Sequence, residues 1–190
     1  MINLGGCVVN KYKYFKRGLN KLSKNKNYFY YYFISEKNSF ISLENNYHYT
    51  LYFIKTNKNK KIKIQNKFFK ISDGCSINNI KNKEVLFPYA GTHLLIAGSK
   101  GNKNTKIKKT LYKSHYRVKK PWGYELWINE DKSNHVLKEI FIKKGNKTSL
   151  QYHNFKTETN FLYNGSADLF YKKNKKIKNL NVKKKDISKF

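Results

Sequence analysis

Short runs in which apolar and polar residues alternate recur along this chain, and each run ends at a cluster of turn-forming residues. A period of two places every second side chain on the same face of a β-strand, so this alternation predicts half-buried strands. The runs are rich in the β-branched and aromatic residues that strands favour, and no apolar stripe with helical spacing exceeds about three turns. We therefore predict strands over residues 39–43, 49–54, 61–65, 68–71, 85–87, 93–97, 124–128, 136–142, 148–152, 160–163 and 167–171.

Turn-forming clusters and lysine-rich segments divide these strands into two blocks. Glu44-Asn45-Asn46 and Ser72-Asp73-Gly74 are such clusters, since Asn, Asp and Gly supply the backbone conformations of tight turns. Short strands separated by turns are typical of β-sandwiches and barrels, so the predicted fold is two all-β units in tandem. The predicted organisation is a basic N-terminal arm (1–27), a first β domain (28–98), a lysine-rich linker (99–116) and a second β domain (117–190).

The composition favours a folded chain in a reducing, cytoplasmic compartment. Hydrophobic residues make up 39% and aromatic residues 16%, more than a wholly disordered chain would contain. No run approaches the ~18 apolar residues of a membrane-spanning helix. Leu4-Gly5-Gly6-Cys7 resembles a lipoprotein cleavage box, but too few residues precede Leu4 for a signal peptide. Cys7 and Cys75 by themselves make neither a disulfide framework nor a zinc cluster.

The net charge of +30, from 41 Lys+Arg against 11 Asp+Glu, raises the question of a nucleic-acid partner. The cations are lysines apart from Arg17 and Arg117, whereas sequence-reading sites depend on the bidentate guanidinium group of arginine. The lysines also occur with Asn, Ile and Tyr, as in residues 57–64, which is typical of AT-rich coding. We predict a solvated lysine surface with no specific nucleic acid; a basic nucleic-acid-associated protein remains an alternative, marked by steep salt dependence.

One short segment combines residue types that can hold a metal ion. Gln151 and His153 are two residues apart, so on a strand they project from the same face. Glu158 follows after enough residues for a tight turn, and Gly145 and Gly165 suit the turns that would bound such a hairpin. An amide oxygen, an imidazole and a carboxylate form a suitable ligand set for a divalent ion such as zinc. The alternative is an exposed strand face that binds nothing.

These residues also resemble a known family pattern. The spacing of Gly145, Gln151, His153, Glu158 and Gly165 is similar to the first motif of the cupins, with Gln where many cupins have the first His. Over residues 118–171 the chain resembles type II mannose-6-phosphate isomerase, the cupin domain often fused behind mannose-1-phosphate guanylyltransferase. Three collinear segments carry this resemblance: Lys120-Pro121-Trp122-Gly123-Tyr124-Glu125, Lys138-Glu139-Ile140 and Ser149-Leu150-Gln151-Tyr152-His153.

The resemblance implies a jelly-roll barrel with a divalent metal, zinc in the first place and manganese as an alternative, held by Gln151, His153 and Glu158. The implied reaction interconverts mannose 6-phosphate and fructose 6-phosphate in polysaccharide or nucleotide-sugar precursor metabolism. The metal would polarise the carbonyl group while a side chain moves the proton, and no residue is assigned to that role. Lys138 and Lys156 are candidates for the substrate phosphate, although Lys156 stands where the family usually has Arg. No nucleotide-binding segment of a guanylyltransferase is present.

The chain departs from the cupin pattern after this motif. A cupin site draws a further His from a downstream strand, whereas no His follows His153. We therefore expect a second barrel that is truncated, or one that another copy completes through the barrel edges in a homo-oligomer. The first block resembles a degenerate cupin at residues 67–77, with Cys75 where Asp is usual and interpreted as a small buried residue. The remaining histidines are expected to be surface or core residues, namely His48, His93, His115 and His135.

Three hypotheses about function follow. The first is a mannose-6-phosphate isomerase-like enzyme whose activity is impaired by loss of the second cupin motif. The second is a non-catalytic cupin that binds a sugar or another metabolite without turnover. The third is the basic nucleic-acid-associated protein, whose affinity would fall steeply with salt.

Overall fold

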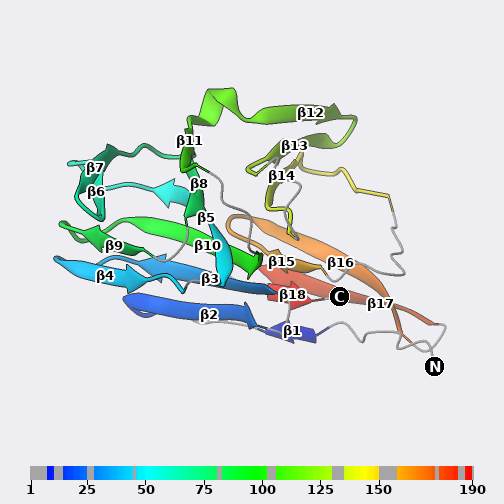
Figure 1. Ribbon diagram of the computed structural model, residues 1–190. Helices are drawn as coiled ribbons and strands as arrows, with labels where there is room; N and C mark the ends of the chain where they lie inside the picture. The colour runs from blue at the N-terminus through cyan, green and yellow to red at the C-terminus, as the bar shows by residue number, and fades with distance from the viewer. Residues whose placement is uncertain are drawn as a thin grey trace. The chain divides into compact units, whose positions relative to one another are not determined.

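β-Strands make up the regular structure of the chain, apart from one 3-10 helix at Tyr112–Ser114 (η1) (Figure 1). This structure is a computed structural model, and it describes residues 8–10, 15–24, 28–44, 46–80, 83–101, 106–129, 135–149, 158–173, 176–183 and 187–189. Within these ranges there is no α-helix, and no helix has the length and apolar character needed to span a membrane. The all-β class predicted from the sequence is confirmed.

Backbone contacts divide the chain into two compact units. One unit comprises Lys16–Lys147, and the other comprises Met1–Phe15 together with Thr148–Phe190. These limits differ from those derived from the sequence, which placed boundaries after residues 27, 98 and 116. The sequence-based domain limits stay a prediction, and the two units are described separately below.

A six-stranded antiparallel sheet forms the larger part of the Lys16–Lys147 unit, in the order β11-β8-β5-β10-β3-β2. Its central strands are rich in tyrosine, phenylalanine and β-branched residues, which pack well on a pleated surface. The strands are β2 (Gly18–Lys24), β3 (Tyr28–Ile34), β5 (Tyr47–Lys55), β8 (Ser76–Ile80), β10 (His93–Lys100) and β11 (Lys108–Thr110).

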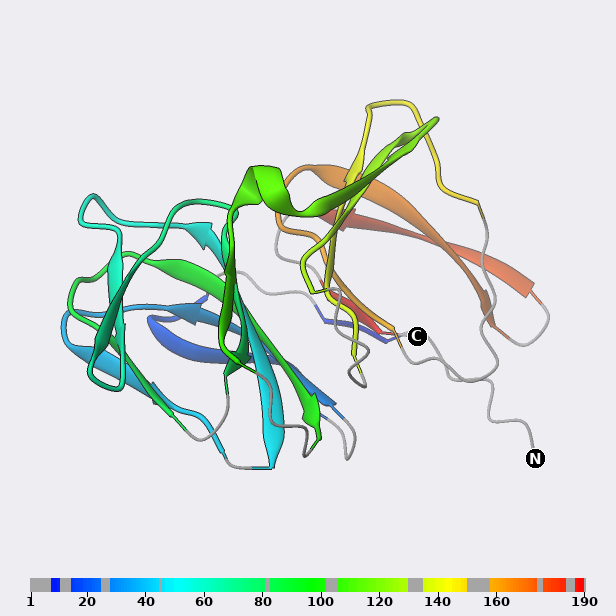
Figure 2. The same ribbon diagram turned by 45° about the horizontal axis from the view of Figure 1, so that its top comes forward.

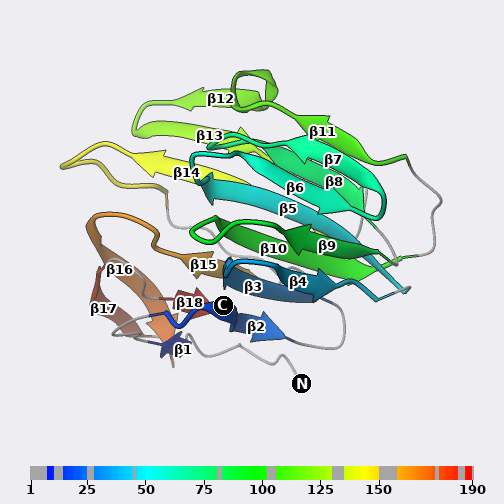
Figure 3. The ribbon, with the colours of Figure 1, turned by 90° about the vertical axis from the view of Figure 1, so that its left-hand side faces the viewer.

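A four-stranded antiparallel sheet lies against it, in the order β4-β9-β6-β7, and Figure 3 shows it in front of the six-stranded sheet. Its strands are β4 (Ser39–Ser42), β6 (Lys61–Ile64), β7 (Lys67–Lys70) and β9 (Glu84–Phe87). The β6–β7 turn is short, and Gln65 adopts a positive φ of 51° there. These four strands coincide with runs of alternation predicted from the sequence.

The hydrophobic core is built from the alternate residues of both sheets. On β5, Leu51 and Phe53 are fully buried, while Thr50 and Tyr52 project from the other face of the same strand. From the four-stranded sheet the core receives Ile62, Ile64, Val85 and Phe87, and from the six-stranded sheet it also receives Phe29, Phe33, Ile77, Leu94 and Ile96.

Eight of the described strands lie where the sequence analysis gave none, at residues 8–10, 18–24, 28–34, 76–80, 108–110, 116–120, 176–183 and 187–189. Three of them lie in segments interpreted as an arm, a linker or a lysine-dominated stretch. β2 pairs with β3 inside the predicted basic arm, β11 pairs with β8 inside the predicted linker, and β17 (Lys176–Lys183) pairs with β16 (Ser166–Lys173) in the lysine-dominated segment. Each of the three lies beside a strand whose backbone N–H and C=O groups need partners, and a lysine-rich strand satisfies them as well as an apolar one does. Lysine stems also cover apolar surface while their ammonium groups stay in water.

In the unit of residues 1–15 and 148–190, the described strands form two small antiparallel sheets. One has the order β1-β18-β15, made of Val8–Asn10, Ile187–Lys189 and Thr159–Phe161, and the other is the β16–β17 hairpin. β15 and β16 match the runs predicted at 160–163 and 167–171 in part or in full. The run predicted at 148–152 differs, because Thr148 and Ser149 lie outside any strand and its other residues are outside the described part.

The core assignment predicts a large difference between two phenylalanines. Phe53→Ala should lower the free energy of unfolding by about 3–5 kcal/mol, because it leaves a cavity in the fully buried core. Phe68→Ala, at a side chain that is 65% exposed on β7, should change it by less than about 0.5 kcal/mol. Urea unfolding followed by tryptophan fluorescence measures both, and equal losses would contradict the assigned core.

Candidate functional site

Two of the three segments that carry the family resemblance, Lys120–Glu125 and Lys138–Ile140, lie in a three-stranded antiparallel sheet within the Lys16–Lys147 unit. It consists of β12 (Tyr116–Lys120), β13 (Gly123–Trp127) and β14 (Lys138–Ile142), in that order. Figure 2 shows β12 and β13 as a hairpin that follows the 3-10 helix. The hairpin turns at Pro121 and Trp122, and the Lys143 amide donates to the Trp122 carbonyl over 2.9 Å.

Gly123 is required at the start of β13 for two reasons. Its φ of 151° lies in a region that L-residues avoid, and a Cβ atom there would be 1.9 Å from the Phe141 carbonyl oxygen. Glycine therefore permits the close backbone approach that lets β13 pair with β14. This explains the glycine in the Lys120–Glu125 motif in terms of strand packing.

Polar side chains attach the β13–β14 segment to the six-stranded sheet, on the face that points away from the apolar core. The Ser76 hydroxyl and the Asn78 amide donate to the Ile128 carbonyl over 3.4 and 3.3 Å. His135 contacts the Ser99 hydroxyl through Nδ1 at 2.7 Å and the Thr50 hydroxyl through Nε2 at 3.4 Å. Strand residues that point away from the apolar core thus supply the contacts.

A chain of hydrogen bonds continues this attachment to the surface. The Tyr52 hydroxyl donates to Glu139 Oε2 over 2.5 Å, and the Tyr124 hydroxyl donates to Glu139 Oε1 over 3.2 Å. Tyr112 and Tyr124 share a hydrogen bond of 3.3 Å between their hydroxyl groups. Arg117 donates to the Tyr112 hydroxyl over 3.0 Å, and its guanidinium carbon lies 3.9 Å from the Tyr124 ring centroid. We call these five residues the Tyr52–Arg117 network.

Raised pKa values keep Tyr52 and Tyr124 of this network neutral. Burial, followed by the hydrogen bond to Glu139, raises the pKa of Tyr52 well above its usual range. Burial and the hydrogen bond shared with Tyr112 raise the pKa of Tyr124 to about 12. The hydrogen bond to Tyr112 raises the pKa of Arg117, which stays cationic. At neutral pH the network is therefore two O–H donors on one carboxylate, flanked by a cation.

Lys138, predicted to contact the substrate phosphate, is engaged by two neighbours. Its Nζ lies 3.0 Å from Glu125 Oε2 and 3.9 Å from the Trp127 ring centroid. Lys120 adds a second, longer ion pair to Glu125 at 3.7 Å. Burial by itself would raise the pKa of Glu125, but the hydrogen bond and charge of Lys138, with Lys120, outweigh it and lower that pKa. The phosphate role of Lys138 stays a prediction.

Of the predicted metal ligands, the structure describes Glu158, which is half-buried and directly precedes β15. Gln151 and His153 lie outside the described residues, as does Lys156, the other candidate for phosphate contact. Elsewhere in the described part of the chain, no group of three His, Cys, Asp or Glu side chains is placed to hold a metal ion. Gly145 and Gly165 have φ angles of 77° and 85°, as expected of glycines in turns. The metal site itself stays a prediction.

The other histidines and Cys75 are buried or hydrogen-bonded within the fold. His115 is buried and bonds to the Gly74 carbonyl at 3.2 Å, and His93 contacts the Tyr32 hydroxyl at 2.7 Å. His48 is buried on β5. Cys75 is completely buried in the core, where burial raises the pKa of its thiol. A small buried cysteine is what the sequence analysis predicted.

The sequence analysis did not find the Tyr52–Arg117 network. Glu139 lay inside a motif noted for its family resemblance, and Tyr52 lay inside a predicted strand. The alternation on β5 already separated Tyr52 from the apolar face, but it gave no sign that Glu139 would be its partner. Those two residues are 87 positions apart in the chain.

The network predicts that the effect of Tyr52→Phe on the free energy of unfolding changes with pH in the alkaline range. Loss of a hydrogen bond to a carboxylate should lower the free energy of unfolding by about 1.5–3 kcal/mol at pH 7. Because the folded state raises the pKa of Tyr52 above the value of about 10 in the unfolded chain, its contribution is complete below pH ~10 and is lost as the pH rises further. The difference between parent and variant should therefore shrink from pH 10 to 11 in urea unfolding experiments. A Tyr116→Phe control at an exposed side chain should change little, and a pH-independent difference for Tyr52→Phe would refute the assignment.

Gly123 gives a second prediction. Gly123→Ala should lower the free energy of unfolding by about 2 kcal/mol or more, since it adds backbone strain and a clash with the Phe141 carbonyl. Gly91→Ala is the matched control, because Gly91 also has a positive φ, of 86°, but an added Cβ would meet no atom within 4 Å. Equal losses of unfolding free energy in the two variants would show that the close approach contributes nothing.

Comparisons with known proteins bear on the fold and on the family resemblance. Residues 107–185 match the family model described as mannose-6-phosphate isomerase C-terminal, and no curated protein matches the chain. An IolB-like protein from Salmonella typhimurium LT2 has a similar structure, with a TM-score of 0.69 and 11% identity over 95% of this chain and 83% of that one. Protein YlbA from E. coli, of the family DUF861, is similar with a TM-score of 0.62 and 11% identity over 100% of this chain and 84% of its own.

At such low identity the two structures speak for the fold alone, and both are of the cupin type. The family match includes the whole of the 118–171 segment on which the resemblance was based. The predicted fold is therefore confirmed, and the predicted resemblance to this family is found over residues 107–185. The chain is a cupin-fold protein whose residues 107–185 carry the mannose-6-phosphate isomerase C-terminal sequence pattern.

Proposed function

We propose that residues 107–185 bind a sugar phosphate with the help of a divalent metal ion, and that the associated chemistry is the interconversion of mannose 6-phosphate and fructose 6-phosphate. The family match over these residues is the observation that carries this proposal. We further propose that the protein acts in polysaccharide or nucleotide-sugar precursor metabolism in the cytoplasm.

The metal ligands in this proposal are Gln151, His153 and Glu158. Their donor atoms are an amide oxygen, an imidazole nitrogen and a carboxylate oxygen, a set that suits zinc and also manganese. When bound, such an ion would polarise the sugar carbonyl and stabilise negative charge on its oxygen. Of the three, Glu158 lies in the described part of the chain, where it is half-buried.

The β13–β14 hairpin, within the Lys16–Lys147 unit, carries Lys138, the first proposed phosphate contact. Tyr52 and Glu139 fix the hairpin to the six-stranded sheet, and Lys138 presents a cation from β14. Its ion pair with Glu125 is partly exposed, and such pairs contribute only about 0–1 kcal/mol, so a phosphate dianion can compete for the ammonium group. Lys156 is the second proposed phosphate contact.

A matched pair of double variants tests the metal site. Gln151→Ala with His153→Ala should lower the bound metal, measured by mass spectrometry on the dialysed protein, from about one ion per chain to a background level. Gln65→Ala with His93→Ala removes the same residue types elsewhere and should leave the metal content unchanged. Equal metal content in both double variants would remove Gln151 and His153 from the site.

A phosphorus NMR experiment on the metal-loaded protein distinguishes catalytic turnover of mannose 6-phosphate from binding without turnover. Conversion of mannose 6-phosphate into fructose 6-phosphate that is lost in the Gln151/His153 variant would establish the isomerase. Line broadening of the mannose 6-phosphate signal without conversion would support the second candidate, a non-catalytic cupin that binds a sugar phosphate. Neither turnover nor broadening would refute sugar-phosphate recognition.

A further inference from the structure

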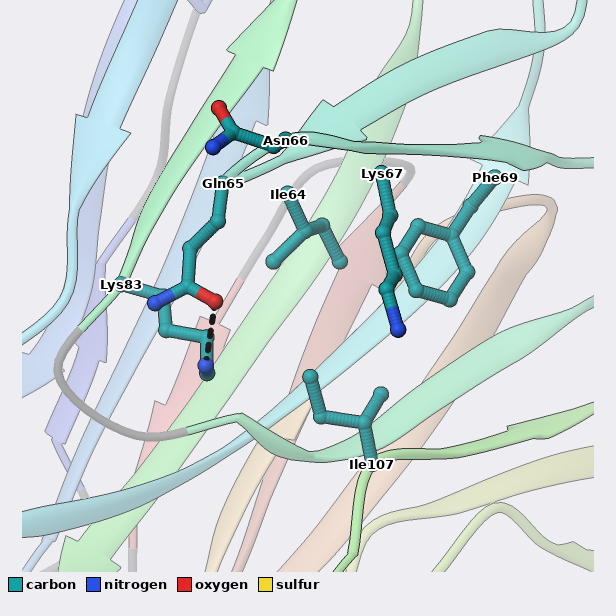
Figure 4. Close-up of a pocket in the computed structure, with 7 residues that line it drawn as sticks. All are labelled: Ile64, Gln65, Asn66, Lys67, Phe69, Lys83 and Ile107. Atoms are coloured by element: carbon teal, nitrogen blue, oxygen red, sulfur yellow. Dashed lines mark hydrogen bonds between the residues drawn. The ribbon is translucent and has the colours of Figure 1, made fainter.

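A pocket of about 540 Å³ opens beside the β6–β7 hairpin, outside the residues assigned above (Figure 4). It lies between this hairpin and the segment that leads into β11, all within the Lys16–Lys147 unit. Its volume is in the range of pockets that bind small organic molecules. The lining residues are Ile64, Gln65, Asn66, Lys67, Phe69, Lys83 and Ile107.

The floor of this pocket is apolar and belongs to the core. Ile64 is 2% exposed, and Phe69 and Ile107 are half-buried residues that pack against the core cluster. Alternation on β7 explains the arrangement, since Lys67 and Phe69 share one face of the strand, whereas Phe68 and Lys70 share the other. The pocket therefore exposes hydrophobic surface at the bottom of an otherwise polar opening.

The rim of the pocket is cationic, with two ammonium groups and no carboxylate among the lining residues. Figure 4 shows the Lys67 side chain extending from the hairpin toward Ile107, with Lys83 on the other side of Ile64. Lys83 Nζ donates to Gln65 Oε1 over 2.6 Å, which restrains this ammonium at the rim. In the part of the chain that the structure describes, neither Lys67 nor Lys83 is ion-paired to a carboxylate.

The neighbouring acidic side chain does not enter the pocket. Glu84 accepts a hydrogen bond from the Gln65 amide, but through its backbone carbonyl. On β9, Val85 is the residue that faces the core, so the Glu84 side chain projects to the opposite, exposed face of the four-stranded sheet. The positive charge at the rim is thus not neutralised by this residue.

We propose that this pocket binds a small organic anion that combines an apolar ring or branched chain with a carboxylate or phosphate group. The apolar part would cover Ile64, Phe69 and Ile107, and the anionic group would contact Lys67 and Lys83. Burial of apolar surface and charge-assisted hydrogen bonds are both required, because either contribution alone is small at a half-open site. This inference is independent of the proposed sugar-phosphate site, since none of the pocket-lining residues is among the residues proposed there, namely Gln151, His153, Glu158, Lys138 and Lys156.

The test follows isoleucine methyl groups by NMR in the full-length protein while a probe is added at about 0.15 M salt, where long-range attraction to the lysine surface is screened. The probes are benzoate and phenyl phosphate, which separate the two anionic groups, with benzyl alcohol and inorganic phosphate as half-probes. We expect saturable shifts of the Ile64 and Ile107 methyl signals with benzoate, phenyl phosphate or both. Shifts with neither anion, or equal affinity for a half-probe, would overturn the proposal.

Three lysine variants give the matched control. Lys67→Met and Lys83→Met keep the aliphatic stem and remove the charge, and each should weaken the binding of the responding probe about fivefold or more. Lys70→Met removes the same charge from the opposite face of β7 and should change the affinity less than twofold. Unchanged methyl signals for core residues such as Ile77 and Ile96 verify that each variant is folded. Equal weakening in all three variants would show general attraction to lysine and overturn the site.

Discussion

Both faces of the six-stranded sheet carry buried side chains, so the polar residues on its second face need hydrogen-bond partners inside the protein. On β5 the apolar residues Leu51 and Phe53 enter the core, while Thr50 and Tyr52 are buried on the other side. A buried hydroxyl without a partner costs about 1–3 kcal/mol, which is a substantial part of the stability of a small domain. The contacts to His135 and Glu139 remove that cost, and they determine where the β13–β14 segment lies on the sheet.

The consequence for function is that the family motif is held by polar contacts as well as by the buried apolar side chains of Leu126, Ile128 and Leu137. Polar contacts have preferred distances and directions, so they add a constraint on the orientation of the hairpin. The same residues that would face a sugar phosphate, such as Lys138, are then carried on a strand whose position is fixed at Glu139. Gly123 adds a further constraint, since only a residue without a Cβ atom fits beside the Phe141 carbonyl.

Much of the fold and part of the candidate site were predictable from the sequence. The runs at 49–54 and 93–97 correspond to β5 and β10, because one buried face imposes a period of two on any strand. β2, β11 and β17 were not predicted, since lysine-rich edge strands are held by backbone hydrogen bonds that leave no hydrophobic pattern. The family was identified from Lys120–Glu125 and the segments after it, whereas Gln151 and His153, which lie outside the described residues, keep their role as a prediction.

By itself the sequence determined the all-β class, the family resemblance of residues 118–171 and the faces on which the residues of the predicted strands lie. Only the tertiary structure decided which strands are neighbours, that Tyr52 meets Glu139, and that Ile64 and Ile107 line one pocket with Lys67 and Lys83. The physical reason is that alternation depends on burial, which is a local property of each strand. The pairing of strands and side chains depends on long-range packing among many alternatives of similar local energy, and no short segment contains that information.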